Sequence, residues 1–249
     1  MATGTIHYLG ALFLNGNPQP MPTKPRSNGN IPQYTGGPIE IRDTDTSPEN
    51  QLQWIEVTHN GKTLLICDRV ILANVSWDEL DARGLIFGRE EILDGKKCLL
   101  RSLTGSVSAN TTDNEWDQFI SNILNLPGLP SPNDDSTDKH NQTWNWYNIW
   151  TWCQGTALNH FAHRAVRGSI SARRWGHGTS SNANATLGWR PVLELLDTDP
   201  LRLDEERSAE LTGPKTNTPK EQAGKLSPPV FVSILLGKLE RLARAARSL

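Results

Sequence analysis

The sequence has few cysteines, no long apolar run and no excess of one charge. Its three cysteines, Cys67, Cys98 and Cys153, each lie in an apolar stretch, so we expect buried free thiols rather than a disulfide framework. Such usage fits folding in a reducing cytosol. No run approaches the roughly 20 apolar residues that span a bilayer. The formal net charge of −2 excludes a global field that would attract nucleic acid or anionic membranes.

A secretory signal is also missing from the first residues. Met1 to Thr5 show neither a basic region nor the start of an apolar one. We therefore expect synthesis in the cytoplasm. Action outside a cell would then depend on association with a virus particle, such as a phage tail, or on another export route.

Motifs that mark catalysis or metal binding are scarce. The sequence has no His-Glu-x-x-His, Cys-x-x-Cys, Gly-x-Ser-x-Gly or Walker motif. His160 and His163 have the spacing of a metal pair, and Asp134, Asp135 and Asp138 form an acidic loop, but solvated surface residues are the preferred interpretation of both. We therefore expect no enzyme activity, no cofactor and no metal.

Composition divides the chain into three parts. Residues 1–50 are rich in Pro and Gly and predict an arm with one strand at 5–14. Residues 51–196 carry the regular apolar patterns of a folded domain. Residues 197–249 predict a Pro-containing linker and a basic amphipathic helix at 234–249. Self-association through the arm or this helix is the expected role of the two ends.

The middle of the chain alternates apolar runs with turn signals. Asn60-Gly61 and Asp94-Gly95 each separate two apolar runs, which predicts two β-hairpins. Further apolar or aromatic runs predict strands at 144–153, 164–167 and 187–196. These short strands indicate small antiparallel sheets.

Two short helices are expected among the strands. Ser76 and Glu79 have the spacing of a capping box and predict a helix over 77–84. A second helix is predicted from Thr112, since an apolar face follows at helical spacing: Trp116, Phe119, Ile120, Ile123 and Leu124. The elements together favour an α+β fold.

The last apolar run of the domain reads Gly188-Trp189-Arg190-Pro191-Val192-Leu193. It resembles the final strand of C-type-lectin-like domains in bacterial and phage proteins. Earlier landmarks follow in the expected order at 100–105, 114–117, 144–152 and 164–168, and then at Trp175. The resemblance covers roughly residues 52–196 and implies a C-type-lectin-like fold of the α+β class.

Within that superfamily the chain is most similar to the variable proteins of diversity-generating retroelements. Their binding residues are diversified by adenine-directed mutagenesis of AAC-like codons, and the resulting NNC-like codons cannot specify Lys, Glu, Gln, Met or Trp. Residues 156–190 contain no Lys, Glu, Gln or Met. Their two tryptophans, Trp175 and Trp189, are landmark positions of the lectin-like domain. An ordinary Ser/Asn/Gly surface loop would share part of this bias. Many variable proteins end soon after the final strand, whereas here residues 197–249 follow.

The resemblance implies a ligand-binding surface at about 156–188, presented on a tryptophan-rich scaffold and directed at a protein or glycan on a target cell surface. The residues expected to contact the ligand are Asn159, His160, Phe161, His163, Ser169, Ser171, Arg174, His177, Thr179, Ser180, Ser181, Asn182, Asn184 and Thr186. The expected scaffold residues are Trp116, Trp144, Trp146, Trp152, Trp175 and Trp189. A carbohydrate-stacking platform is the alternative role for the tryptophans.

Two other functions stay open from the sequence. One is a structural virion or injection-apparatus component without variable ligand binding. The other is a formylglycine-generating-enzyme-like oxidoreductase, because the lectin-like fold also includes such enzymes. Against the enzyme, Cys153 has no second cysteine nearby, and the His-x-x-x-Glu motif of iron-dependent relatives is missing.

Overall fold

A computed structural model describes residues 2–23, 30–133, 137–146 and 148–196 of the chain. The predicted linker and amphipathic helix at 197–249 lie outside the described residues. None of the helices in the described part is long and apolar enough to cross a membrane.

The fold class predicted from the sequence is wrong, because the described structure is mostly β. Strands account for 40% and helices for only 11%. The predicted helices contribute little, since α1 spans five residues (Trp77–Asp81) and the second predicted helix shrinks to a single turn. Strands contribute more than half of the buried apolar side chains, and loops and short helices contribute the others, among them Leu85 and Trp144.

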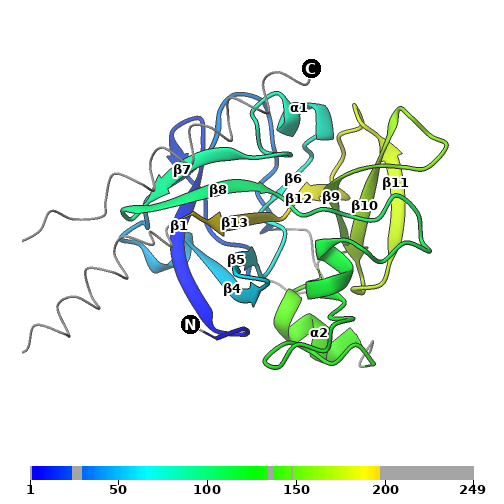
Figure 1. Cartoon of the computed structure of the whole chain (residues 1–249). Helices are drawn as coiled ribbons and strands as arrows, with labels where there is room; N and C mark the ends of the chain where they lie inside the picture. Colours follow the sequence, from blue (N-terminus) through cyan, green and yellow to red (C-terminus); the bar gives the residue numbers. More distant parts are fainter. Residues whose placement is uncertain (1, 24–29, 134–136, 147, 197–249) are drawn as a thin grey trace, which may run out of the picture. The chain divides into compact units, whose positions relative to one another are not determined.

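The larger sheet has eight strands and curls into an antiparallel half-barrel. Its strand order is β2-β1-β4-β5-β13-β8-β7, with β3 paired to β1 (Figure 1). The bounds are β1 Ile6–Leu14, β2 Asn17–Pro18, β3 Ile39–Arg42, β4 Gln51–His59, β5 Lys62–Cys67, β7 Arg89–Leu93, β8 Lys96–Ser102 and β13 Pro191–Leu195.

The two predicted hairpins of this sheet are confirmed. Asn60 and Gly61 adopt φ values of 49° and 75° at the turn between β4 and β5. Asp94 and Gly95, at 47° and 75°, do the same between β7 and β8. Two consecutive positive φ angles define the turn whose twist matches that of the paired strands.

The smaller sheet has five strands in the order β11-β10-β9-β12-β6, so that β11 lies at one edge (Figure 1). Its bounds are β6 Leu72–Ala73, β9 Ile149–Thr156, β10 His163–Ser169, β11 Trp175–Thr179 and β12 Leu187–Trp189. The strand predicted at 144–153 therefore begins later, and β11 falls where a loop was expected.

The segment predicted as an N-terminal arm belongs to the larger sheet in its described residues. Strand β1 pairs with both β3 and β4. Leu9, Leu12 and Tyr34 are buried in the same apolar cluster as Trp152 and Trp189. The prolines of this region interrupt regular structure without preventing burial, because apolar side chains recur between them.

The helical predictions meet mixed outcomes. The capping box is confirmed, since the Ser76 hydroxyl accepts from the Glu79 backbone and the Glu79 carboxylate accepts from the Ser76 backbone. The helix predicted from Thr112 is wrong in length: only a π-helical turn, η3 (Trp116–Ile120), forms, and Asn122 breaks it with a φ of 49°. Helix α2 (Thr137–Trp144) lies partly in a predicted loop, and a 3₁₀ turn, η2 (Pro48–Asn50), precedes β4.

The predicted closing strand is split at Arg190. Residues before it form β12 in the smaller sheet, and residues after it form β13 in the larger sheet. Trp189 and Arg190 are both fully buried at the junction. The run from β12 to β13 thus connects the two sheets through its backbone, and its buried side chains pack at their junction.

Candidate ligand-binding surface

The smaller sheet rests on a tryptophan frame, which we define as Trp116, Trp144, Trp146, Trp152 and Trp189. All five side chains are buried. Three of the indole N–H groups are anchored: Trp116 donates to the Ala172 carbonyl (2.7 Å), Trp152 to the Val75 carbonyl (2.8 Å) and Trp189 to the Ser102 hydroxyl (3.1 Å). The scaffold role predicted for these tryptophans agrees with their burial. Trp175 is only half-buried.

Arg190 is a buried arginine among the tryptophans of the frame, and its role was not predicted from the sequence. The Arg190 guanidinium lies over the rings of Trp144 and Trp146, at 5.9 Å and 5.2 Å from their centroids. It donates to the carbonyls of Cys67 (3.1 Å) and Trp144 (2.7 Å). The aromatic faces and the two carbonyls compensate part of the cost of burying a cation.

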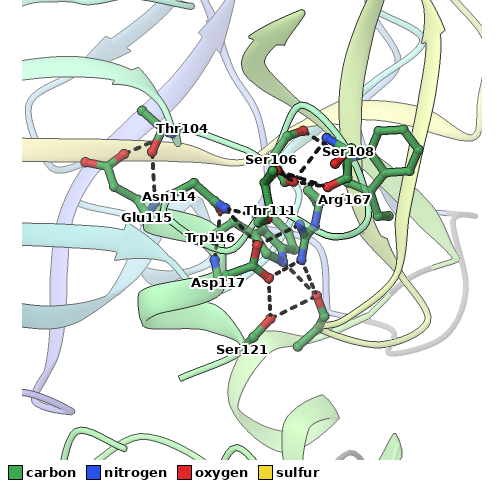
Figure 2. Close-up of polar contacts among 12 residues, drawn as sticks. Thr104, Ser106, Ser108, Thr111, Asn114, Glu115, Trp116, Asp117, Ser121 and Arg167 are labelled. Carbon is green, nitrogen blue, oxygen red and sulfur yellow. Dashed lines mark hydrogen bonds and ion pairs between the residues drawn. The ribbon is translucent and has the colours of Figure 1, made fainter. Parts of the chain in front are cut away.

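A second buried cation, Arg167 on β10, is paired with Asp117 of η3 (Figure 2). Arg167 donates through Nη2 to Asp117 Oδ1 (2.5 Å) and through Nη1 to Oδ2 (3.0 Å). Asn114 and Ser121 donate to the same carboxylate at 2.8 Å and 3.3 Å. These bonds fix β10, the strand next to the edge strand β11, to the π-helical turn.

The segment before η3 closes one face of the smaller sheet. Trp175 of β11 donates its indole N–H to the Ser106 carbonyl (2.9 Å), and the Ser106 hydroxyl contacts Thr111 (Figure 2). The approach is close, because a Cβ added to Gly105 would lie 2.5 Å from the Cβ of Cys153. The opposite face of β11 is equally tight, since a Cβ at Gly178 would lie 3.1 Å from the Trp152 ring.

Most of the residues predicted to contact a ligand lie at the surface of this frame. Nine are exposed: Asn159, His160, Phe161, Arg174, His177, Thr179, Ser181, Asn182 and Thr186. Four are half-exposed: His163, Ser171, Ser180 and Asn184. We call these thirteen residues the display surface. Phe161 is 88% exposed, unusually high for a large apolar side chain.

Ser169, which was also predicted to contact the ligand, does not belong to the display surface. Its side chain is buried, with 7% exposure, and its backbone takes a φ of 72° at the end of β10. The Ser169 carbonyl accepts from the Asn148 backbone at 3.0 Å. The residue shapes the turn out of β10 and offers little side chain to a ligand.

The structure brings three of the predicted histidines together. The rings of His160, His163 and His177 lie 4.8 to 5.3 Å apart between centroids. Nδ1 of His163 and Nδ1 of His177 are 2.7 Å apart, so one nitrogen donates and the other accepts. Burial and the two neighbouring imidazoles lower the pKa of His177 below its usual 6.5. We call these three residues the histidine cluster.

Other predicted residues lie apart from the histidine cluster. The register of β10 and β11 places His163 opposite Thr179, whereas Ser171 and Arg174 lie beyond the other end of this pair. The 180–186 loop holds its own shape: Asn184 Oδ1 accepts from the Thr186 backbone (2.8 Å) and hydroxyl (2.7 Å). Asn184 therefore supports the loop as well as facing solvent.

Two cysteine thiols are poor nucleophiles in this structure. Burial raises the pKa of Cys67 and of Cys153 to about 12 in each case. All three cysteines are buried and free, as the sequence predicted. Within the described ranges, no group of three or more His, Cys, Asp and Glu side chains is arranged to hold a metal ion.

A hollow of about 220 Å³ lies elsewhere, between the β4–β5 turn and η3. Two of its charged lining residues are already paired within the protein. Lys62 binds Glu194 at 2.7 Å, and Glu115 binds Arg101 at 2.6 Å. The hollow therefore offers a ligand fewer available charges than the display surface does.

The comparisons with known proteins add no relative. No family model, no curated protein and no solved structure matches this chain.

The display surface is expected to contribute little to stability. Replacing His177, Asn182 and Asn184 together by Ala should lower the free energy of unfolding by about 1 kcal/mol or less, because none of the three is buried. The small loss reflects the Asn184 hydrogen bonds to Thr186. Thermal unfolding followed by circular dichroism measures the effect. A loss above about 3 kcal/mol would place these residues in the core instead.

Proposed function

We propose that this chain is a ligand-binding protein that presents a diversifiable surface on a rigid frame. In this proposal it is a variable protein of a diversity-generating retroelement or a phage tail adhesin that contacts a target cell. One observation carries the proposal: polar residues predicted to vary are exposed, while the residues beneath them are buried and hydrogen-bonded. Binding residues on loops and edge strands of a stiff scaffold are a recurrent arrangement.

The contact side chains suit recognition more than chemistry. Ser, Thr, Asn and His give adaptable hydrogen bonding, and Phe161 supplies a rigid aromatic contact, much as in antibody loops. The raised pKa of Cys153 argues against the formylglycine-type alternative, which needs a reactive thiol. A purely structural virion role has no observation that favours it over binding.

Sequencing the gene with its flanks tests diversification directly. We expect a near-copy of the stretch that encodes residues 156–190 beside a reverse transcriptase gene. Differences between the two copies should fall at adenines of the near-copy and change codons of the display surface. Codons for Trp175, Gly176, Gly178 and Trp189 should be identical in both. A locus without a second copy, or with differences spread evenly over buried and exposed codons, would contradict retroelement diversification.

A further inference from the structure

The display surface lies in a stretch of the chain without carboxylates. Residues 156–190 contain no Asp or Glu, although the chain has 27 of them among 249 residues. At that average frequency a stretch of this length would hold about four. Five arginines and three histidines occur in the same stretch. NNC-like codons can specify Asp, so the codon bias does not explain its absence.

Three of these arginines lie at the surface and are not neutralised by any carboxylate of the described residues. Arg167 and Arg190 are buried in the frame, whereas Arg173 and Arg174 are exposed and Arg164 is half-exposed. Across the described part of the chain, no carboxylate forms an ion pair with any of the last three. Arg174 instead lies over the Trp150 ring, 5.2 Å from its centroid. Arg173 donates to the Pro132 carbonyl, which is a neutral partner. Exposed cations without a carboxylate partner favour an anionic ligand.

Among the described residues, the histidine cluster likewise forms no ion pair with a carboxylate. His177 is influenced by His160 and His163, and both of these disfavour its charged form. Two charged groups on neighbouring elements have contacts of their own. Arg164 of β10 lies over the Trp77 ring, and Asp78 of α1 accepts from the Ser180 hydroxyl at 3.2 Å. A carboxylate supplied from outside would stabilise the protonated form of His177.

Apolar side chains beside the cluster narrow the class of ligand. Phe161 is 88% exposed, Leu158 59% and Val107 39%. Leu158 and Val107 are adjacent, because the Leu158 backbone donates to the Val107 carbonyl at 2.8 Å. An acidic polysaccharide supplies anions but no apolar side chains to cover such residues. A protein surface supplies both, and buried aromatic anchors dominate many protein interfaces.

We propose that the ligand of the display surface is an acidic protein surface in which carboxylates flank an aromatic or aliphatic side chain, and that mild acidification tightens the complex. The inference rests on the proposed ligand-binding function and names its ligand class. Partner carboxylates pair with Arg173, Arg174 and protonated His177. The partner's apolar side chain packs against Phe161.

The direction of the pH dependence follows from the histidines. His163 and His177 share a nitrogen-to-nitrogen hydrogen bond, in which one ring donates and the other accepts through an unprotonated nitrogen. Since the pKa of His177 lies below 6.5, the ring gains its charge only in acidic solution. A bound carboxylate favours the charged form, so affinity rises as pH falls from 7.5 to 5.5.

The test measures binding of the full chain to three immobilised probes by biolayer interferometry: a glutamate–tyrosine copolymer, poly-glutamate and heparin. Each is compared at pH 7.5 and 5.5 and constant ionic strength. One variant carries Arg173→Ser with Arg174→Ser, and a second carries Asn in place of His160, His163 and His177. The matched control, Arg42→Ser with Lys96→Ser, removes the same charge from the larger sheet.

We expect the copolymer to bind most tightly, and about tenfold more tightly at pH 5.5 than at 7.5. The arginine variant should bind it about fivefold more weakly at both pH values. The histidine variant should bind equally at both, and the control should stay within twofold of the wild type. Melting temperatures of all variants, measured in parallel, separate lost contacts from lost folding.

Four results would overturn this inference: tightest binding to heparin, equal losses in the arginine variant and the control, wild-type binding that does not depend on pH, or no binding to any probe. The gene test of the proposed function is independent of ligand charge. A template copy in the gene without copolymer binding therefore rejects the acidic ligand alone. Copolymer binding without a template copy rejects diversification alone.

Discussion

Trp189→Ala should destabilise the protein by about 3–5 kcal/mol, a large share of the roughly 5–15 kcal/mol by which folded domains are stable. The Trp189 side chain is fully buried in the apolar cluster that also holds Trp152 and Leu193. Its removal leaves a large cavity where the two sheets meet and strips the Ser102 hydroxyl of its 3.1 Å donor. Urea unfolding followed by far-ultraviolet circular dichroism measures the loss.

A matched control for Trp189→Ala is Phe161→Ala, which removes an aromatic ring that is 88% exposed. This change should alter the free energy of unfolding by no more than about 0.5 kcal/mol. Comparable losses in the two variants would mean that Phe161 is packed and that the frame and the surface are not separate. The same control also tests whether ligand binding depends on Phe161.

Arg167→Met should cost about 3–5 kcal/mol, because it leaves the Asp117 carboxylate buried without its cation. Asn114 and Ser121 would still donate to Asp117, but neutral donors do not replace a charge. The double variant Arg167→Met with Asp117→Leu should recover much of the loss, since it removes both charges. Urea denaturation of the single and double variants measures the coupling.

Arg174→Met serves as the control for charge removal alone. Arg174 is exposed and pairs with no carboxylate among the described residues, so stability should change by about 0.5 kcal/mol or less. If the double variant is as unstable as Arg167→Met, apolar packing around η3 rather than the ion pair maintains this part of the fold. Binding by the double variant would then report how far η3 orders the display surface.

Local signals predicted the parts of the fold that depend on neighbouring residues. Asn60-Gly61, Asp94-Gly95 and the Ser76–Glu79 box specify a turn or a cap within four residues, and all three are confirmed. The helix expected from Thr112 failed, because tertiary contacts of Asp117 and a positive φ at Asn122 override its apolar periodicity. The α+β class failed with it.

Residue composition predicted the exposed residues of the display surface well. The apolar pattern predicted the strands and buried contacts around the tryptophan frame less well. Small polar residues such as Asn182 are exposed in the structure, and their residue type alone predicts that exposure. Strand β11 was missed because its glycines carry no strand propensity, and they are required by the Trp150 and Trp152 rings behind them. The buried role of Arg190 was missed because its partners, the Cys67 carbonyl and Trp144, are far away in the sequence.

The place of β13 has a consequence for how the chain is made. This strand comes last among those described, yet it pairs with β5 on one side and β8 on the other. Until residue 195 leaves the ribosome, the larger sheet lacks a central member and exposes two unpaired strand edges. Such long-range pairing slows folding and invites association with other chains. Nascent chains truncated before Pro191 should therefore be strong chaperone substrates.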